Sequence, residues 1–232
     1  MAKKNQEKFK KQDEQLESVN QTLTGAGKWI EDNSNMLTWC VIGIAAVVMA
    51  VILINQRVLQ PKAQLAADEN AKSIAYFMKG DYDKALTGDD KDDVFLGFEA
   101  TANQYSWFQE GKLAALYAGI CYYEKGDYET AAQYLSKFSA KDLNIAPAAK
   151  QMLGDAYVEL GEYGKAAKAF EAAAKSGNEI IAPMSLKKAG LVYLERGDKK
   201  SAKRVFEAIK NDYPTSNEAQ DIDKYIAISD AE

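Results

Sequence analysis

The chain of 232 residues contains no histidine and only two cysteines. Without histidine it cannot build a Ser-His-Asp triad, a histidine general base or a histidine-ligated zinc site, which are the commonest catalytic and metal-binding arrangements. The sequence also lacks a Gly-rich phosphate loop and a nucleophile motif. These absences predict a protein that is not an enzyme and that uses no cofactor and no metal.

The two cysteines, Cys40 and Cys121, are far apart in the chain and lie in segments of different character. Cys40 lies in a long apolar run, whereas Cys121 lies in a predicted helix, so the sequence offers no intramolecular disulfide framework. Cys40 stands at the start of the apolar run rather than after its end, which argues against a lipoprotein attachment site.

Charge is absent from Asn33 to Gln56, and residues 36–54 are nearly all apolar. As a helix these 19 residues would measure about 28 Å, close to the hydrocarbon thickness of a bilayer. The alternatives are a buried core helix and a cleaved signal peptide, but the 35 residues before the run are too many for a typical signal peptide. We therefore predict one uncleaved transmembrane helix over residues 36–54.

Residues 1–32 form a polar tail that carries six lysines. Lysine and arginine tend to stay in the cytoplasm, which favours a cytoplasmic N-terminus, although the charges closest to the span are balanced and do not decide the orientation. We interpret the tail as a solvated segment. The alternative is that Lys8, Lys10 and Lys11 contact anionic lipid headgroups.

Beyond the apolar run, a glycine-centred tetrapeptide recurs at residues 125–128, 160–163 and 196–199, a spacing of 35 or 36 residues. Each copy lies between two Ala-rich amphipathic stretches. A period of about 34 residues with small and aromatic residues at fixed offsets is typical of tetratricopeptide (TPR) helix pairs, which stack into a solenoid and bind proteins.

Residues 112–216 contain three such repeats. Each has a small residue on its first helix, an aromatic residue three positions later and an alanine nine positions after that, and we expect all of them to pack in the core. The small residues are Gly119, Gly154 and Gly190, the aromatic residues are Tyr122, Tyr157 and Tyr193, and the alanines are Ala131, Ala166 and Ala202. The residues expected to pack against them from the second helices are Leu135, Phe170 and Phe206.

Residues 62–111 form a degenerate first repeat. Pro61 is expected to end the stretch that follows the apolar run, and a helix is predicted over residues 62–78, closed by the turn at 79–82. The second helix of this repeat is interrupted at residues 86–93. Four aspartates in that insertion lack the ligand spacing of an EF-hand, so we predict a solvated loop: Asp89, Asp90, Asp92 and Asp93.

Residues 217–232 complete the predicted fold as a C-terminal capping helix, which a solenoid needs at its open end. The helix is expected over residues 217–228, with Ala219, Ile222, Tyr225 and Ile226 on its apolar side. The predicted class is therefore all-α: one N-terminal transmembrane helix, a TPR-like α-solenoid of about four helix pairs, and a capping helix.

The order of these parts, with the segments 82–89 and 117–123, resembles the YfgM-like family of single-pass bacterial membrane proteins. The resemblance covers nearly the whole chain. It implies an anchor in the bacterial inner membrane with a cytoplasmic N-terminus and periplasmic repeats. It also implies association with the Sec translocon and with periplasmic chaperones.

In TPR solenoids the first helix of each pair lines the concave face. The residues expected there are Leu113, Leu116, Ile120 and Tyr123; Ala148, Gln151, Asp155 and Val158; and Met184, Lys187, Leu191 and Leu194. Leu116 and Ile120 occupy positions where chaperone-tail binders carry a polar carboxylate clamp, so that activity is not expected. A mainly apolar groove suits an amphipathic helix or an extended apolar segment. The sequence leaves open whether the terminal helix or a second copy covers it.

The part of the chain after Arg57 has a net charge of about −6, which argues against nucleic acid as a ligand. We therefore expect protein partners, among which translocon subunits, periplasmic chaperones and emerging polypeptide chains are implied by the resemblance. The function predicted first is a membrane-anchored adaptor ancillary to the translocon and chaperones. The alternative is a structural scaffold for another cell-envelope complex.

Overall fold

The computed structural model describes residues 28–91 and 94–231, and the chain divides into two compact units that meet at Gln60 and Pro61. Within the described residues the regular structure is helical, apart from one isolated bridge between Asp89 and Phe95. The prediction of an all-α chain is confirmed. The predicted polar tail falls almost entirely on residues 1–27, outside the described part of the chain.

The first unit contains α2 (Ser34–Ile54), a helix of 21 residues of which none is buried. It is long and apolar enough to cross a membrane, by length and composition. Trp39 in this helix is 73% exposed and Trp29 before it is 55% exposed. A π-helical turn, η1 (Asn55–Leu59), follows α2, and the Gln60 N–H donates to Asn55 O.

Pro61 lies where the two units divide, and the helix expected over residues 62–78 corresponds to α3 (Gln60–Phe77). This helix begins one residue before Pro61. Proline is tolerated in the first turn of a helix, where the backbone N–H that it lacks would have no partner within the helix.

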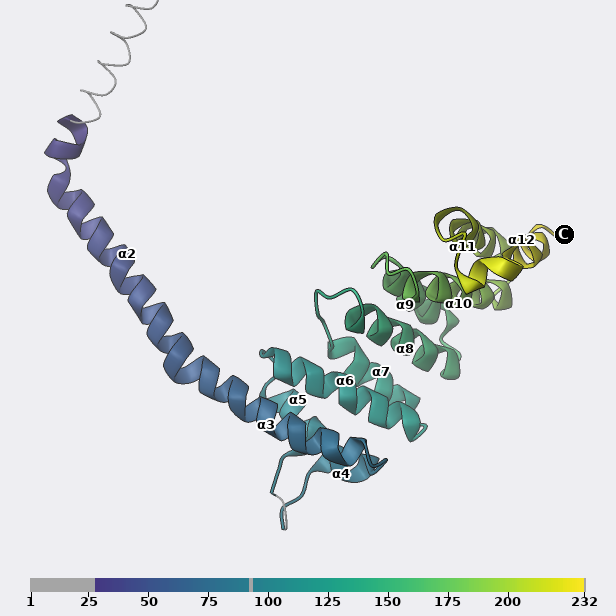
Figure 1. Cartoon of the computed structure of the whole chain (residues 1–232), viewed down its shortest axis with the longest axis horizontal. Coiled ribbons are helices and arrows are strands. Elements are labelled where there is room, and N and C mark those ends of the chain that lie inside the picture. Colours follow the sequence, from purple (N-terminus) through teal and green to yellow (C-terminus); the bar gives the residue numbers. More distant parts are fainter. Residues whose placement is uncertain (1–27, 92–93, 232) are drawn as a thin grey trace, which may run out of the picture. The chain divides into compact units, whose positions relative to one another are not determined.

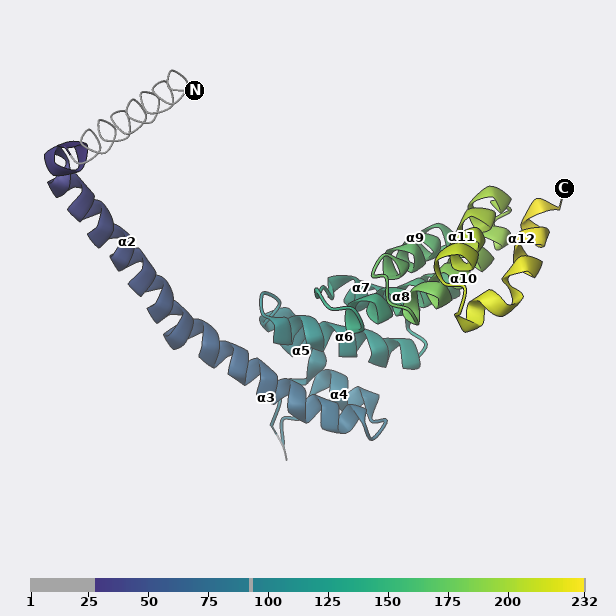
Figure 2. The same cartoon turned by 45° about the horizontal axis from the view of Figure 1, so that its top comes forward.

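The second unit is a stack of helices joined by short turns (Figure 1). After α3 its elements are α4 (Tyr82–Thr87), α5 (Gly97–Gln104), α6 (Gln109–Glu124), α7 (Tyr128–Lys137), α8 (Ile145–Glu159), α9 (Tyr163–Ala174), α10 (Ile181–Glu195), α11 (Lys199–Asp212), η2 (Asn217–Asp221) and α12 (Ile222–Asp230). The pairs α6–α7, α8–α9 and α10–α11 follow one another along the solenoid, as Figure 2 also shows. These pairs are the three predicted repeats.

The recurring glycine ends the first helix of each pair. Gly126 has φ +80°, its N–H donates to Tyr123 O at 3.0 Å, and the Asp127 N–H donates to Tyr122 O at 2.9 Å. Together these two hydrogen bonds form the Schellman motif, which requires a residue in the left-handed backbone conformation. Glycine adopts this conformation without a Cβ clash. Gly80, Gly161 and Gly197 repeat the same positive φ.

The residue after the glycine begins the second helix. The Asp127 side chain accepts a hydrogen bond from the Thr130 N–H at 3.1 Å, and Asp198 accepts one from the Ser201 N–H at 3.0 Å. These are N-caps, which satisfy backbone donors that the first helical turn leaves unpaired. One tetrapeptide therefore ends one helix and begins the next.

The two helices of a pair interlock where the sequence predicted a small residue opposite a large one. A Cβ added to Gly119 would lie 2.6 Å from Leu135 Cγ, and one added to Gly154 would lie 2.5 Å from Phe170 Cε1. Gly190 meets Phe206 in the same way. The predicted alanines Ala131, Ala166 and Ala202 are each fully buried. The glycines, the alanines and their large partners are buried as predicted, whereas Tyr122, Tyr157 and Tyr193 are half-buried and pack against the core clusters.

The degenerate first repeat consists of α3 with the two short helices α4 and α5. Phe98 is fully buried and stacks on Tyr117 with ring centroids 5.2 Å apart, which joins α5 to α6. α4 ends at Thr87 and α5 begins at Gly97, whereas the interruption was predicted over residues 86–93. Lys84 forms an ion pair with Asp89 at 2.5 Å. Asp92 and Asp93 lie outside the described residues.

The C-terminal cap differs from its prediction because it begins as the 3₁₀ turn η2 and becomes α-helical only at Ile222. The Ser216 hydroxyl accepts a hydrogen bond from the Ala219 N–H at 3.2 Å, which closes a tight first turn. Ile222, 2% exposed, packs with Ala219, Tyr225 and Ile226 against α11, so the predicted apolar side is confirmed.

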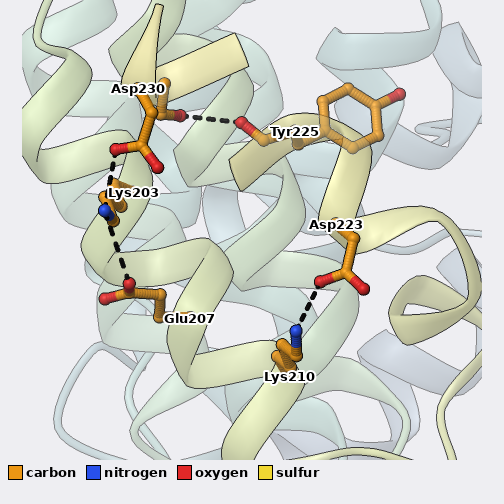
Figure 3. Close-up of polar contacts among 7 residues, drawn as sticks. Lys203, Glu207, Lys210, Asp223, Tyr225 and Asp230 are labelled. Atoms are coloured by element: carbon orange, nitrogen blue, oxygen red, sulfur yellow. Dashed lines mark hydrogen bonds and ion pairs between the residues drawn. The ribbon is translucent and has the colours of Figure 1, made fainter. Parts of the chain in front are cut away.

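Ion pairs hold the cap on α11, as Figure 3 shows. Lys203 Nζ lies 2.7 Å from an Asp230 oxygen, and Lys210 Nζ lies 2.7 Å from an Asp223 oxygen. Both pairs are substantially exposed, so they orient the cap more than they stabilise it.

Candidate binding surface

The twelve residues expected on the concave face all lie on α6, α8 and α10, and we call them the first-helix face. On α6, Leu113, Leu116 and Ile120 turn toward the next repeat, and Leu116 is only 7% exposed. They share one apolar cluster with residues of α7, of the turn after it and of α8: Leu135, Phe138, Ala149, Met152 and Leu153. Leu116 therefore belongs to the packing between repeats, whereas Leu113 and Ile120 stay partly exposed.

The polar residues of the first-helix face connect α8 to α10. Gln151 accepts a hydrogen bond from the Ser185 hydroxyl at 3.2 Å, and its amide lies 3.2 Å from Met184 Sδ. Lys188 Nζ donates to both carboxylate oxygens of Asp155 at 2.7 Å. Each contact spans 33 or 34 residues, which is one repeat. Gln151 and Asp155 are thus engaged by the next repeat.

The terminal cap covers the far end of the first-helix face. Lys187 Nζ lies 2.6 Å from an Asp221 oxygen and 5.1 Å from the centre of the Tyr225 ring. Leu194 packs in the same cluster as Ile222. This answers in part the question that the sequence left open, because the terminal helix covers α10 at these two residues.

An apolar strip remains accessible along the three helices. Leu191 is 42% exposed and Met184 is 37% exposed on α10, and Ala148 is exposed on α8. Val158 on α8 is half-buried against α9 and α10. This strip, with a charged pair at its middle, is chemically suited to an amphipathic helix or an extended apolar segment.

Tyr123 lies on α6, where the α6–α7 repeat meets the α8–α9 repeat. Its ring contacts Tyr128 edge-on with centroids 5.2 Å apart. Burial raises the pKa of its hydroxyl above the usual 10, and the negative charges of Asp155 and Glu159 on α8 raise the pKa further. The hydroxyl is therefore protonated at neutral pH and can donate a hydrogen bond to a ligand.

Lys188 is the residue that the sequence reasoning missed. It does not occupy one of the positions that normally point to the concave face, yet its ammonium reaches the Asp155 carboxylate. The signal in the sequence was its spacing from Asp155, because residues one repeat apart lie on adjacent first helices. Lys188 also lies 5.7 Å from the centre of the Phe170 ring.

Within residues 28–91 and 94–231 there is no group of three or more Cys, Asp or Glu side chains arranged to hold a metal ion.

Two family models match parts of the chain. Residues 113–142 match the tetratricopeptide repeat, which agrees with the α6–α7 hairpin. Residues 136–230 are similar to the family described as "T7SS, ESX-1 secretion system protein EccA1, N-terminal domain". No curated protein matches the chain. The second unit is therefore a TPR-type helical array, an architecture that binds proteins.

Proposed function

We propose that this protein is a membrane-anchored adaptor that binds other proteins through its TPR repeats. The observation that carries the proposal is the succession of a helix long and apolar enough to cross a membrane and a stack of TPR hairpins. The anchor in this proposal is α2, and the repeats lie on the periplasmic side of a bacterial inner membrane, with the N-terminus in the cytoplasm.

The mechanism rests on effective concentration. A groove tethered to a membrane stays close to any partner in the same membrane, so a weak affinity is sufficient for frequent binding. The accessible strip on α6, α8 and α10 would supply the contact, with Leu191 and Met184 as its most exposed apolar side chains. Apolar surface that becomes buried in the complex supplies the binding free energy.

The partners proposed first are translocon subunits, periplasmic chaperones and emerging polypeptide chains. The resemblance to the YfgM-like family supports this choice. Similarity of residues 136–230 to a domain of a secretion-system protein is compatible with a role beside export machinery. That same similarity favours the second candidate, a structural scaffold in an envelope complex with stable stoichiometric partners.

The test is crosslinking in cells of the full chain with a C-terminal tag, followed by detergent purification and mass spectrometry. A tagged unrelated single-span protein controls for abundant membrane proteins. A Leu191→Asp variant tests the surface, and Leu160→Asp is its matched control, because Leu160 is 39% exposed but lies in the turn after α8.

Enrichment of translocon subunits with periplasmic chaperones, lost in Leu191→Asp but kept in Leu160→Asp, is the expected result. Recovery of one defined envelope complex without them would favour the scaffold. Recovery of cytoplasmic proteins alone would show that the proposed orientation is inverted. Equal recovery by the two variants would show that the partner binds elsewhere.

A further inference from the structure

A positively charged cleft lies where α9 begins beside the turn that follows α10. Its volume is about 460 Å³, and it is lined by residues 161–165 together with Lys168 and Arg196. Three cations and the carboxylate of Glu162 in this lining give a net charge of +2. Lys165 Nζ lies 2.6 Å from a Glu162 oxygen, so the uncompensated charge is that of Lys168 and Arg196. We call this the basic cleft, and none of its residues belongs to the first-helix face.

The basic cleft lies in a positive stretch of an otherwise acidic unit. Residues 163–204 contain ten Lys or Arg and four Asp or Glu, which gives a net charge of +6. The remaining residues after Arg57 contain twelve Lys or Arg and 24 Asp or Glu, which gives −12. Positive charge is therefore concentrated in the part of the unit that contains the cleft, where it attracts anionic groups.

Two cations of the basic cleft are available to an external anion. In the part of the chain that the structure describes, Lys168 and Arg196 form no hydrogen bond and no ion pair. Asp198, two residues after Arg196, is already engaged, because its carboxylate accepts the capping hydrogen bond from the Ser201 N–H at 3.0 Å. The pKa of Asp198 lies below its usual value chiefly because of its hydrogen bonds with Ser201, with a smaller effect from Arg196. Arg196 thus has a carboxylate nearby but none in contact.

An ion pair elsewhere in the solenoid shows what the basic cleft lacks. Lys125, directly before the glycine that ends α6, forms an ion pair with Asp83 in the first turn of α4. Arg196 stands in the same position, directly before the glycine that ends α10. Asp83 lies two residues after the N-cap of α4, and the residue two positions after the N-cap of α9 is Gly164. The later repeat therefore has the cation but no carboxylate.

Gly164 leaves the place of the missing carboxylate open. A Cβ added to Gly164 would lie 3.7 Å from Arg196 Nη1 and 3.9 Å from Arg196 Cζ. A side chain at this position would therefore meet the guanidinium group in ordinary van der Waals contact. An approaching carboxylate can occupy the same space, and arginine and lysine form charge-assisted hydrogen bonds with carboxylates.

We propose that the basic cleft binds an aspartate or glutamate side chain of a partner protein, which takes the place that Asp83 has beside Lys125. Arg196 and Lys168 hold the carboxylate. The proposal rests on the proposed function in one respect, that the partner is a protein, and it adds a second contact outside the first-helix face. Because an exposed ion pair contributes little free energy, the cleft selects an acidic segment more than it holds one by itself.

Fluorescence anisotropy with the full chain in detergent micelles tests this proposal. The probe is a short fluorescein-labelled peptide of alternating glutamate and alanine, measured at neutral pH and low ionic strength. The control peptide has glutamine in place of every glutamate. We expect the glutamate peptide to bind, the glutamine peptide not to bind, and added salt to weaken the binding, because both partners are exposed charges.

The decisive variant is Gly164→Asp, which supplies the missing carboxylate from within the chain and removes no cation. It should weaken binding of the glutamate peptide about three-fold, whereas Gly164→Ala should bind as the wild type does. Arg196→Gln should also weaken binding about three-fold. Its matched control is Lys150→Gln on α8, an exposed lysine outside the cleft whose replacement changes the net charge equally. Circular dichroism checks that each variant is folded.

Carbodiimide coupling of the glutamate peptide to the wild-type chain gives a result that needs no variant. The reagent joins a carboxylate to a neighbouring lysine amine, and mass spectrometry locates the new amide. We expect the amide at Lys168 or Lys165. An even distribution over the exposed lysines would contradict the site.

The remaining outcomes separate this proposal from the proposed function. Equal binding by Gly164→Asp and Gly164→Ala, with loss of binding in Leu191→Asp, would place the acidic peptide on the first-helix face and overturn the basic cleft alone. Absence of binding to the wild type would likewise overturn the cleft, and partner recovery in cells would still test the adaptor. Displacement of the peptide by inorganic phosphate, but not by acetate at the same ionic strength, would overturn the choice of a carboxylate and assign the cleft to a phosphoryl group.

Discussion

Lys188 on α10 donates hydrogen bonds to both oxygens of Asp155 on α8, each at 2.7 Å. The two side chains are about one-third exposed, 35% for Lys188 and 29% for Asp155. The pair therefore joins two repeats across the first-helix face. Water reaches both groups, so its contribution to stability is modest.

A double-mutant cycle of Asp155→Asn and Lys188→Met should give a coupling free energy of about 0.5–1 kcal/mol, measured by urea unfolding at low salt. The physical reason is that the Lys188 ammonium donates to both oxygens of the Asp155 carboxylate while both side chains are partly buried. The pair Glu162–Lys165 is the control, because it lies within one turn and is more exposed, at 41% and 62%. Equal coupling in the two pairs would contradict a special role for the contact between repeats.

Gly154→Ala should destabilise the chain by about 1–3 kcal/mol in thermal or urea unfolding, because the new methyl group would collide with the ring of buried Phe170. Gly190→Ala should behave alike against Phe206. Gly164→Ala on α9 is the matched control, since its nearest atoms are 3.7 Å away on Arg196. There alanine should be neutral or stabilising, because it favours the helix. A harmless Gly154→Ala would show that the pair of helices separates freely.

Cys121 should resist thiol reagents while the protein is folded. It is fully buried, and that burial raises the pKa of its thiol to about 12, so almost no thiolate exists at neutral pH. The measurement is labelling of a Cys40→Ala variant with a maleimide, with and without urea. Labelling should appear only across the unfolding transition. Fast labelling in the native state would contradict the packing of α6.

The ion pair between Lys187 and Asp221 should make the cap sensitive to acid. The hydrogen bond from Lys187 holds the pKa of the Asp221 carboxyl below its usual 3.8. As the pH falls, the Asp221 carboxyl therefore takes up its proton at a higher pH in the unfolded chain than in the folded chain. The stabilisation that the ionised carboxylate gives the fold is present above about pH 4 and is lost as the pH falls through the pKa of the folded state.

We therefore expect Asp221→Asn to be less stable than the wild type at pH 7 and equally stable once Asp221 is protonated. Lys187→Met removes the cause of the shift and should show the same convergence. The measurement is the urea midpoint from pH 7 to pH 2. A difference that persists unchanged at the acid end would mean that the asparagine acts by another route.

Leu191→Asp should lower partner recovery at least several-fold without changing the unfolding temperature. Leu191 is 42% exposed on α10, so a charge there costs the fold little, whereas it would remain unpaired inside an apolar interface. The unfolding temperature of the purified variant is the check. A large drop in that temperature would assign the loss of binding to unfolding.

The repeats could be predicted because their signals are local. A glycine that ends a helix, an acid that caps the next one and an alanine at a fixed offset each act within a few residues, so their period is visible in one sequence. For the same reason, the uncharged run of residues 36–54 was sufficient to predict α2. The π-turn before Pro61 could not be predicted, because it leaves no signal in the local sequence.

The sequence by itself determined the helix pairs, the glycine at each crossing and the apolar residues that the crossing buries. Only the tertiary structure decided which first-helix residues remain accessible. Ile120 and Leu191 occupy the same position of the repeat, yet Ile120 is half-buried in a cluster that includes Ala149 of α8, whereas Leu191 is 42% exposed. Accessibility depends on the neighbouring repeat, and the pairing of Asp155 with Lys188 likewise depends on a contact between residues 33 positions apart.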